Sequence, residues 1–165
     1  MSTCKSFAPI VDEHSRILIL GSMPGIKSLE QQEYYAHPQN RFWRLLALLL
    51  DEAVPQDYAA KQALLHKHHL ALWDTLGYCE RYGSLDSNIK NEAPNAVAEL
   101  AGELPHLQAV VCNGGKAGAA FKKYFAKKMP EQVQIFYLPS TSPANARLRL
   151  EDLAEHWQVI LQFLA

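Results

Sequence analysis

The most constraining feature of the sequence is an unbroken apolar run, Ile17 to Leu20, which ends in the glycine- and proline-containing turn Gly21 to Gly25. Continuous apolar runs of strand length are typical of strands that are covered on both faces. Further strand-like runs lie at 70–76, 109–112 and 133–138, and they alternate with segments of helical character at 40–51, 56–68, 94–103, 113–128 and 150–164. We therefore predict an α/β fold, a three-layer α/β/α architecture with a central four-stranded parallel sheet.

The remaining segments lack these patterns. Residues 1–15 carry Pro9 and mixed polar residues, and we expect them to form an entry arm. Residues 77–95 are polar and rich in turn-forming residues, which predicts a long connecting loop. A chain of 165 residues can bury one core, so we expect a single domain over residues 1–165.

Composition narrows the classes of function. A net charge of −1 gives no global positive field, so nucleic-acid binding would need a local basic face. The three cysteines are odd in number and form no C-x-x-C pair, which favours a reduced, cytoplasmic protein. No apolar run approaches the roughly 18 residues that a membrane helix needs, and the N-terminus has no apolar signal region. We therefore expect no membrane partner.

Four polar loops follow the predicted strands, at 21–42, 74–92, 113–116 and 139–147. In a parallel sheet such loops gather at one edge, so we expect them to form one cleft. The first loop holds the densest cluster of aromatic and polar residues, with Tyr34, Tyr35, His37, Asn40, Phe42 and Trp43. A flat ligand could stack on a tyrosine there. The amide of Asn40 could hold a water molecule in the cleft, or it could cap the helix that follows.

The turn from Gly21 to Gly25 can approach a ligand closely, because glycine lacks a Cβ atom. Its N–H groups could bind carbonyl or phosphate oxygens, although a plain strand-to-loop turn has the same composition. The turn is not a nucleotide-binding phosphate loop, since no Gly-Lys-Ser/Thr follows it. It also lacks the pattern G-x-S-x-G, which makes Ser22 a poor candidate nucleophile.

Two further segments could contact phosphates. Lys116 follows Asn113-Gly-Gly at a predicted helix start, which is a modest anion site. The loop 139–147 is small, polar and stiffened by prolines, so its hydroxyl and N–H groups could hold a phosphate, or it could be a capped connection. The neighbouring histidines 66, 68 and 69 have no cysteine or carboxylate at ligand spacing, so we predict no metal site.

Taken together, these pieces resemble the uracil-DNA glycosylase superfamily, and in particular its hypoxanthine-DNA glycosylase (DNA-deoxyinosine glycosylase) branch. The long piece Tyr34-Tyr-Ala-His-Pro-Gln-Asn-Arg-Phe-Trp43 is the most specific. The other matching pieces are Gly21-Ser-Met-Pro-Gly25, Leu72-Trp-Asp74 with Cys79 to Ile89, Asn113-Gly114, and Leu138 to Asn145. They occur in the expected order from about residue 7 to the C-terminus.

The resemblance implies roles for individual residues. Mismatch-specific relatives carry a water-positioning asparagine where this chain has Met23, and in the branch that this chain resembles the asparagine of the second motif, here Asn40, takes over catalysis. Tyr35 falls on the base-stacking aromatic. The resemblance and the loop chemistry together predict base contacts at Gly21, Ser22, Met23, Tyr35, His37 and Asn113. They predict DNA contacts at Lys116, Ser140, Thr141, Ser142, Asn145 and Arg147.

The resemblance implies a monofunctional DNA glycosylase of base excision repair. Such an enzyme hydrolyses the N-glycosidic bond of a deaminated base, hypoxanthine or uracil, that is flipped out of double-stranded DNA. We expect a monomer that works in the cytoplasm on nucleoid DNA and needs no metal or organic cofactor. Two alternatives stay open: a hydrolase of a free nucleoside or other small molecule, and a non-catalytic module that recognises DNA damage.

Overall fold

The computed structural model describes residues 2–164, and its centre is a four-stranded parallel sheet with the strand order β3-β2-β6-β7. The strands are β2 (Ile17–Gly21), β3 (Leu70–Asp74), β6 (Ala109–Asn113) and β7 (Gln134–Leu138). Every residue of β2 and β6 is buried, as expected for central strands covered on both faces. The predicted four-stranded parallel sheet is confirmed.

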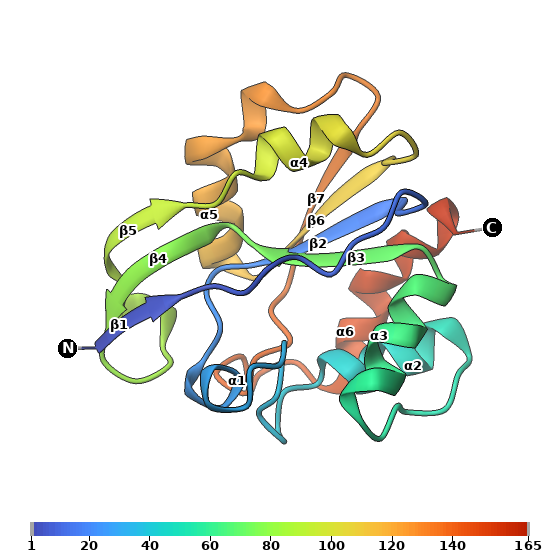
Figure 1. The fold of residues 1–165 in the computed structure, drawn as a ribbon. Coiled ribbons are helices and arrows are strands. Elements are labelled where there is room, and N and C mark those ends of the chain that lie inside the picture. Colours follow the sequence, from blue (N-terminus) through green and yellow to red (C-terminus); the bar gives the residue numbers. More distant parts are fainter. Residues whose placement is uncertain (1, 165) are drawn as a thin grey trace.

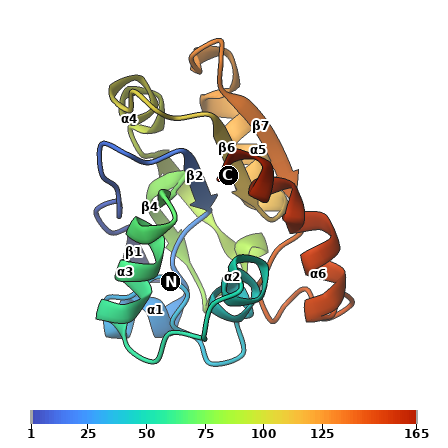
Figure 2. The same ribbon diagram turned by 90° about the vertical axis from the view of Figure 1, so that its right-hand side faces the viewer.

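Helices cover both faces of this sheet (Figures 1 and 2). Because successive side chains of a strand point to opposite faces, Ile17 and Ile19 pack into one core and Leu18 and Leu20 into the other. The first core lies against α2 (Phe42–Leu50), α3 (Tyr58–Lys67) and α6 (Leu150–Trp157). The second core lies against α4 (Val97–Glu103) and α5 (Gly115–Tyr124). The three-layer α/β/α architecture predicted from the sequence is therefore confirmed.

Two of the predicted helices end earlier than expected and continue as 3-10 turns. The helix expected to reach residue 128 ends at Tyr124 and is followed by η2 (Ala126–Lys128). The closing helix expected to reach residue 164 ends at Trp157 and is followed by η3 (Gln158–Phe163). In Figure 2 this closing segment runs beside α2.

Two sequence-based predictions were wrong. The expected entry arm contains β1 (Ser2–Lys5), and the expected long loop contains β4 (Leu76–Arg81), η1 (Asp86–Asn88) and β5 (Lys90–Pro94). The three strands form a separate antiparallel sheet in the order β1-β4-β5, which extends to the left of the parallel sheet in Figure 1. The local pattern did not reveal β1 and β5, because these polar, largely exposed edge strands are held by their pairing with β4.

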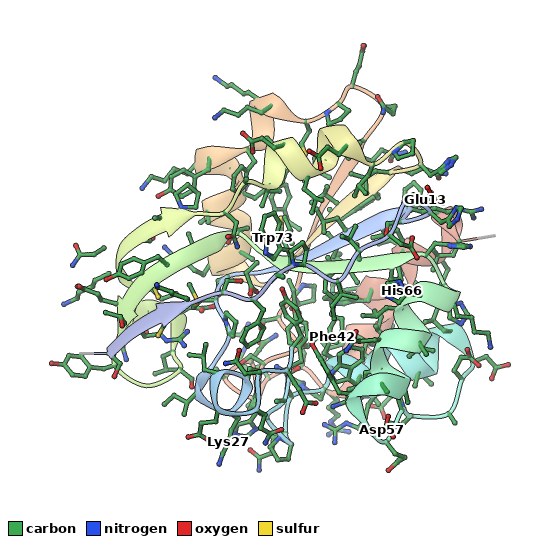
Figure 3. All side chains as sticks on the ribbon, in the orientation of Figure 1. Glu13, Lys27, Phe42, Asp57, His66 and Trp73 are labelled. Atoms are coloured by element: carbon green, nitrogen blue, oxygen red, sulfur yellow. The ribbon has the colours of Figure 1, made fainter. Side chains whose placement is uncertain are left out.

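A short helix, α1 (Ile26–Gln31), was also missed within the segment expected to be a loop. It has six residues, which is too short to show helical periodicity. Figure 1 places it below the parallel sheet, close to the turn that follows β2. There Lys27 extends outward from the helix (Figure 3).

Candidate active site

The carboxyl ends of the parallel strands lie at one edge of the sheet, since Gly21 is aligned with Asp74 and Asn113 with Leu138. A cavity of about 870 Å³ opens at this edge. Segments from all four predicted loops line it, namely residues 21–28, 34–40 in part, 74, 84–87, 113, 115, 139–145 and 147–148. The prediction that these loops form one cleft is confirmed.

Gly21 forms part of the cavity floor, and the floor leaves no room for a side chain there. A Cβ atom on Gly21 would lie 2.7 Å from Oδ1 of Asp74 and 3.2 Å from the hydroxyl oxygen of Tyr35. Both groups therefore converge on the end of β2. The side chain of Met23 is buried against Leu76 and Cys79, so the turn offers a ligand its backbone at this position.

The ring of Tyr35 is held at the cavity in a position where a flat ligand could stack on it. Its ring stacks on Phe42 with a centroid distance of 4.0 Å and an interplanar angle of 23°. Its backbone φ of 54° is left-handed, a conformation that is uncommon for a bulky residue and often marks a functional constraint. Its hydroxyl is buried without a hydrogen-bond partner among residues 2–164. Burial, and then the nearby charge of Asp74, raise the pKa of Tyr35.

The neighbouring tyrosine has a different environment. Tyr34 is buried, its hydroxyl donates to the carbonyl of Ala8 at 3.0 Å, and its own carbonyl accepts from the indole N–H of Trp43 at 3.1 Å. These contacts fix the segment on either side of Tyr35. Of the two adjacent tyrosines, the one that the sequence assigned to base stacking is the one whose hydroxyl lies at the end of β2.

Asn40 both caps a helix and faces the cavity. Its Oδ1 accepts from the backbone N–H of Phe42 at 3.0 Å, which satisfies a donor at the start of α2. Its Nδ2 makes no hydrogen bond with the described residues, and the residue lines the same cavity as Gly21, Ser22 and Tyr35. The capping bond therefore leaves the N–H₂ end of the amide available to a ligand. His37 lies at the exposed side of the cavity lining.

Arg41 is a residue of the site that the sequence analysis missed. Its guanidinium donates to the carbonyls of Ser142 at 2.8 Å and Asn145 at 3.0 Å, and also to the carbonyl of Leu148. Its backbone N–H donates to the carbonyl of Thr141 at 3.1 Å. These bonds fasten the last loop to the second motif, and we call residues 34–43 with residues 139–148 the Asn40 wall.

Asn113 ties the same loop to the sheet. Its Nδ2 donates to the hydroxyl of Thr141 at 3.1 Å, and its Oδ1 accepts from the backbone N–H of Thr141 at 3.0 Å. Thr141 is fully buried, so its side chain anchors the loop from inside. The base contact predicted for Asn113 stays a prediction. The second N–H of its amide is the group that could make this contact.

The other residues predicted to contact DNA have varied positions. Ser140, Ser142, Asn145 and Arg147 all line the cavity, and Arg147 is exposed. The amide of Asn145 donates to the carbonyl of Ser140 at 3.0 Å. Lys116 does not line the cavity, and its ammonium lies 2.5 Å from Oε1 of Glu92. The predicted phosphate contact of Lys116 would compete with this ion pair.

Two carboxylates in the cavity were given no role from the sequence. Asp74 is 3% exposed, accepts from the hydroxyl of Ser6 at 2.8 Å, and has a pKa raised by burial to about 7. Asp86 accepts a hydrogen bond of 2.6 Å from the hydroxyl of Ser22, and burial of its carboxylate raises its pKa. Two features of the sequence could have pointed to these residues. Asp74 directly ends an apolar strand, and Asp86 lies in a polar segment rich in turn-forming residues.

Arg81 supports the segment that carries Asp86. This arginine is 1% exposed, and its Nη2 donates to the carbonyl of Pro24 at 2.5 Å. Its Nε and Nη1 have no hydrogen-bond partner within residues 2–164. Its positive charge lowers the pKa values of Asp74 and Asp86, against the effect of burial. We call residues 82–88 the Asp86 wall.

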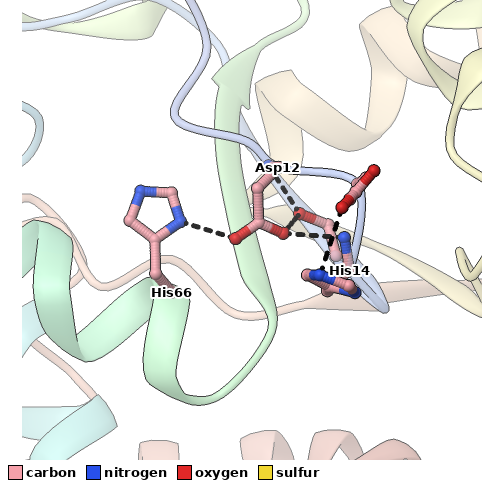
Figure 4. Close-up of polar contacts among 5 residues, drawn as sticks. Asp12, His14 and His66 are labelled. Carbon is pink, nitrogen blue, oxygen red and sulfur yellow. Dashed lines mark hydrogen bonds and ion pairs between the residues drawn. The ribbon is translucent and has the colours of Figure 1, made fainter.

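The histidines that the sequence places near one another are held by carboxylates. His66 Nδ1 lies 3.0 Å from Oδ2 of Asp12 (Figure 4), and His68 Nε2 lies 2.8 Å from Oε2 of Glu52. In the part of the chain that the structure describes, no cluster of three or more His, Cys, Asp or Glu residues could hold a metal ion. Nor does this part contain a helix with the length and apolar character of a membrane span.

Comparison with known proteins identifies the family of the chain. Residues 8–165 match the family described as the uracil DNA glycosylase superfamily. The chain belongs to this superfamily. The family and the enzyme class, DNA glycosylase, that were predicted from the sequence are therefore confirmed.

Individual superfamily members are similar over most of the chain. A hypoxanthine DNA glycosylase of Methanosarcina barkeri is 38% identical over 144 residues, which cover 87% of this chain and 89% of that protein. A hypoxanthine DNA glycosylase of Methanosarcina acetivorans is 34% identical over 160 residues, which cover 96% and 98%. A solution NMR structure of a candidate uracil DNA glycosylase from Methanosarcina acetivorans has 32% identity and a TM-score of 0.85, and each chain is covered to 99%.

Proposed function

We propose that this DNA glycosylase removes hypoxanthine, uracil or both from double-stranded DNA by hydrolysis of the N-glycosidic bond. One observation carries the proposal: the unbonded Nδ2 of Asn40, the ring of Tyr35 and the turn after β2 all belong to one cavity. The names of the two similar hypoxanthine DNA glycosylases support the choice of a deaminated base. Deaminated bases pair poorly, so moving them out of the duplex costs less than moving a normal base.

In this proposal the flipped base stacks on Tyr35. One face of the Tyr35 ring already rests on Phe42, which supports the ring from behind. The backbone N–H groups of Ser22 and Met23 bind the carbonyl oxygen of the base. Such fixed donors stabilise the negative charge that develops on the base as the bond breaks.

Asn40 holds the water molecule that attacks C1′ of the sugar. Its Oδ1 is fixed by the N–H of Phe42, and its Nδ2 can donate to the water oxygen. An amide is a poor base, so departure of the base leads and attack by water follows. The only lysine among the described residues that line the cavity is Lys27, which points outward from α1 and lies 3.8 Å from Glu30. This geometry favours water over a lysine as the nucleophile, and hence a monofunctional enzyme.

The Asn40 wall, which includes Arg147, is proposed to hold the DNA around the gap that the flipped base leaves. The loop 139–148 carries hydroxyl groups, and its carbonyls are fastened by Arg41, so it is stiff enough to press against a duplex. We propose that the protein acts as a monomer, in the cytoplasm and on nucleoid DNA.

A panel of substrates tests this function. Duplex oligonucleotides that carry one deoxyinosine, deoxyuridine or deoxyxanthosine are incubated with excess enzyme, and free base and abasic sites are measured. We expect release from deoxyinosine or deoxyuridine duplexes, without strand cleavage before alkali treatment. Hydrolysis of free inosine with no release from DNA would replace the proposal with a nucleoside hydrolase.

A further inference from the structure

The proposed mechanism contains a group that holds the attacking water but none that accepts its proton. A neutral amide is too weak a base for this step, and enzymes that activate water use a carboxylate or an imidazole. The cavity lining contains one imidazole, that of the exposed His37, whose Nδ1 accepts from the backbone N–H of Gln39 at 3.1 Å, and two carboxylates, those of Asp74 and Asp86. The two carboxylates differ in depth and in hydrogen bonding, and this difference decides which one can serve.

Asp86 has one oxygen that is fixed and one that is available. Its Oδ1 accepts from the hydroxyl of Ser22 at 2.6 Å. Its Oδ2 makes no hydrogen bond with the residues that the structure describes. The residue begins η1, and with Ser84, Leu85 and Ser87 it lines the cavity. The carboxylate is thus oriented by one neighbour and can accept a proton at its other oxygen.

The two carboxylates lie at different depths, one where the base of a bound nucleotide would lie and the other where its sugar would lie. Asp74 lies at the floor, 3% exposed, beside Gly21 and the Tyr35 hydroxyl. Asp86 belongs to an exposed stretch at the mouth, although its carboxylate is covered in part beside the buried Ser22. A base that stacks on Tyr35 occupies the floor, so the sugar attached to it lies toward the mouth. Asp86 is therefore the carboxylate on the side where C1′ is attacked.

The wall that carries Asp86 is fastened to the turn after β2. The backbone N–H of Ile26 donates to the hydroxyl of Ser84 at 2.8 Å, and Arg81 donates to the carbonyl of Pro24 at 2.5 Å. Together with the Ser22–Asp86 bond, these contacts fix the wall at Ser84 and Asp86 and at Arg81, which directly precedes it. A catalytic group held in this way loses little freedom when the substrate binds.

We propose that Asp86 is a second catalytic residue, which accepts the proton of the attacking water and opposes the positive charge of the sugar. The inference rests on the hydrolysis proposed above. The C1′–N bond breaks and its electron pair goes to the departing base. The water oxygen bonds to C1′, and its proton goes to Oδ2 of Asp86. The proton then passes to solvent or to the base anion, which regenerates the carboxylate.

The surroundings of Asp86 suit this task. Burial of the carboxylate raises its pKa and so makes it a stronger base, while the hydrogen bond from Ser22 and the charges of Arg81 and Lys116 act in the opposite direction. The charged or titratable groups that act on it or line the same cavity are Arg81, Lys116, Asp74, Tyr34, Tyr35, His37, Lys27 and Arg147. Activity should therefore fall as the pH drops and Asp86 becomes protonated.

Asp86→Asn separates catalysis from loop anchoring, because the amide oxygen can still accept the Ser22 hydroxyl. Base release from the duplex that the wild type cleaves is measured under single-turnover conditions with saturating enzyme, and the Kd for that duplex is measured separately. We expect a rate loss of about 100-fold or more with little change in Kd. A rate within twofold of wild type means that Asp86 only anchors the wall, and it overturns the inference.

Chemical rescue provides a second readout. Asp86→Ala is assayed with and without sodium formate, and Ser84→Ala, which breaks another anchor of the same wall, is the matched control. We expect formate to raise the Asp86→Ala rate at least several-fold and to leave Ser84→Ala unchanged. Absence of rescue in a folded Asp86→Ala protein that still binds the duplex contradicts proton transfer to residue 86.

The pH profile distinguishes the two carboxylates. Asp86→Asn should remove the acidic limb of the rate profile, Ser22→Ala should move it to higher pH, and Asp74→Asn should retain it. Loss of the limb in Asp74→Asn alone assigns the proton transfer to Asp74 instead. If the wild type releases no base from any duplex, the proposed function itself fails, which is a different result from a wild type that is active and an Asp86→Asn variant that matches it.

Discussion

The two walls of the cavity are each held by an arginine, but the two arginines have different partners. Arg41 donates to the carbonyls of Ser142, Asn145 and Leu148 in the Asn40 wall. Arg81 donates to one carbonyl, that of Pro24, and its remaining charge faces the carboxylates near the Asp86 wall. One wall is fastened by backbone groups that do not titrate, and the other depends on charges that do.

Because of this difference, the Asn40 wall only positions groups, whereas the surroundings of the Asp86 wall change with pH. Backbone carbonyls keep their acceptor strength at every pH, so the Asn40 wall should hold its loop equally well in acid and in neutral solution. Near Arg81, burial raises the pKa of Asp74 to about 7 and raises the pKa of Asp86 as well. Protonation of Asp74 near neutrality therefore alters the surroundings of Arg81, beside the Asp86 wall, and leaves the Asn40 wall unchanged.

The largest effect is expected from Arg41→Ala. Hydrogen bonds from a charged donor contribute about 1.5–3 kcal/mol each, and because Arg41 is partly exposed we expect a total loss of about 2–4 kcal/mol in the free energy of unfolding. The loss should be the same at pH 5.5 and pH 8, and affinity for lesion duplex should fall as well. Urea unfolding at both pH values checks this, and a loss under 0.5 kcal/mol would mean that the loop holds itself.

Arg81→Met should behave differently at the two pH values. At pH 8 Asp74, with a pKa of about 7, is largely ionised, and removing the arginine leaves its buried charge uncompensated. At pH 5 Asp74 is largely protonated, so the loss of the arginine costs little. We expect a loss in unfolding free energy that is about 2 kcal/mol larger at pH 8 than at pH 5. An equal loss at both pH values would remove the distinction between the walls.

The effect expected from Asp74→Asn concerns the slope of stability against pH. The folded pKa of about 7 lies above the ordinary value of 3.8, so between these values the folded protein holds a proton that the unfolded chain has lost. Wild-type stability from this group therefore falls as the pH rises from about 4 to 7. Asp74→Asn keeps an acceptor for Ser6 and should remove most of this fall, which is about 1.4 kcal/mol for each unit by which the folded pKa is raised. Identical slopes in both proteins would place the Asp74 pKa near its ordinary value.

The sequence predicted the parts of the molecule that local patterns control. The run Ile17 to Leu20 and its three counterparts gave the sheet, because buried strands need continuous apolar residues. The position of Asn40 before an apolar helix allowed a bond to the helix start as one of two roles, since a short amide there can accept a backbone N–H. The convergence of the four loops followed from the parallel direction of the strands.

The sequence did not predict features that depend on residues far apart in the chain. The partner of Cys79 across the antiparallel sheet is Cys4, and β1 pairs with β4 over residues that lie more than 70 positions apart in the chain. Arg41 finds its acceptors about a hundred residues later. Asp86 enters the site because Arg81 and Ser22 hold its segment to the first turn, whereas the local composition only indicated a loop.

The most direct test of the account is the rate of base release by Asn40 variants. Asn40→Ser keeps a side chain that caps helices well, and Asn40→Ala removes the cap as well as the amide. Both are assayed against wild type under single-turnover conditions on the deoxyinosine or deoxyuridine duplex that wild type cleaves. We predict losses of about 100-fold or more in both variants, with near wild-type stability in Asn40→Ser. Undiminished release by either variant would contradict the role of the Asn40 amide in holding the attacking water.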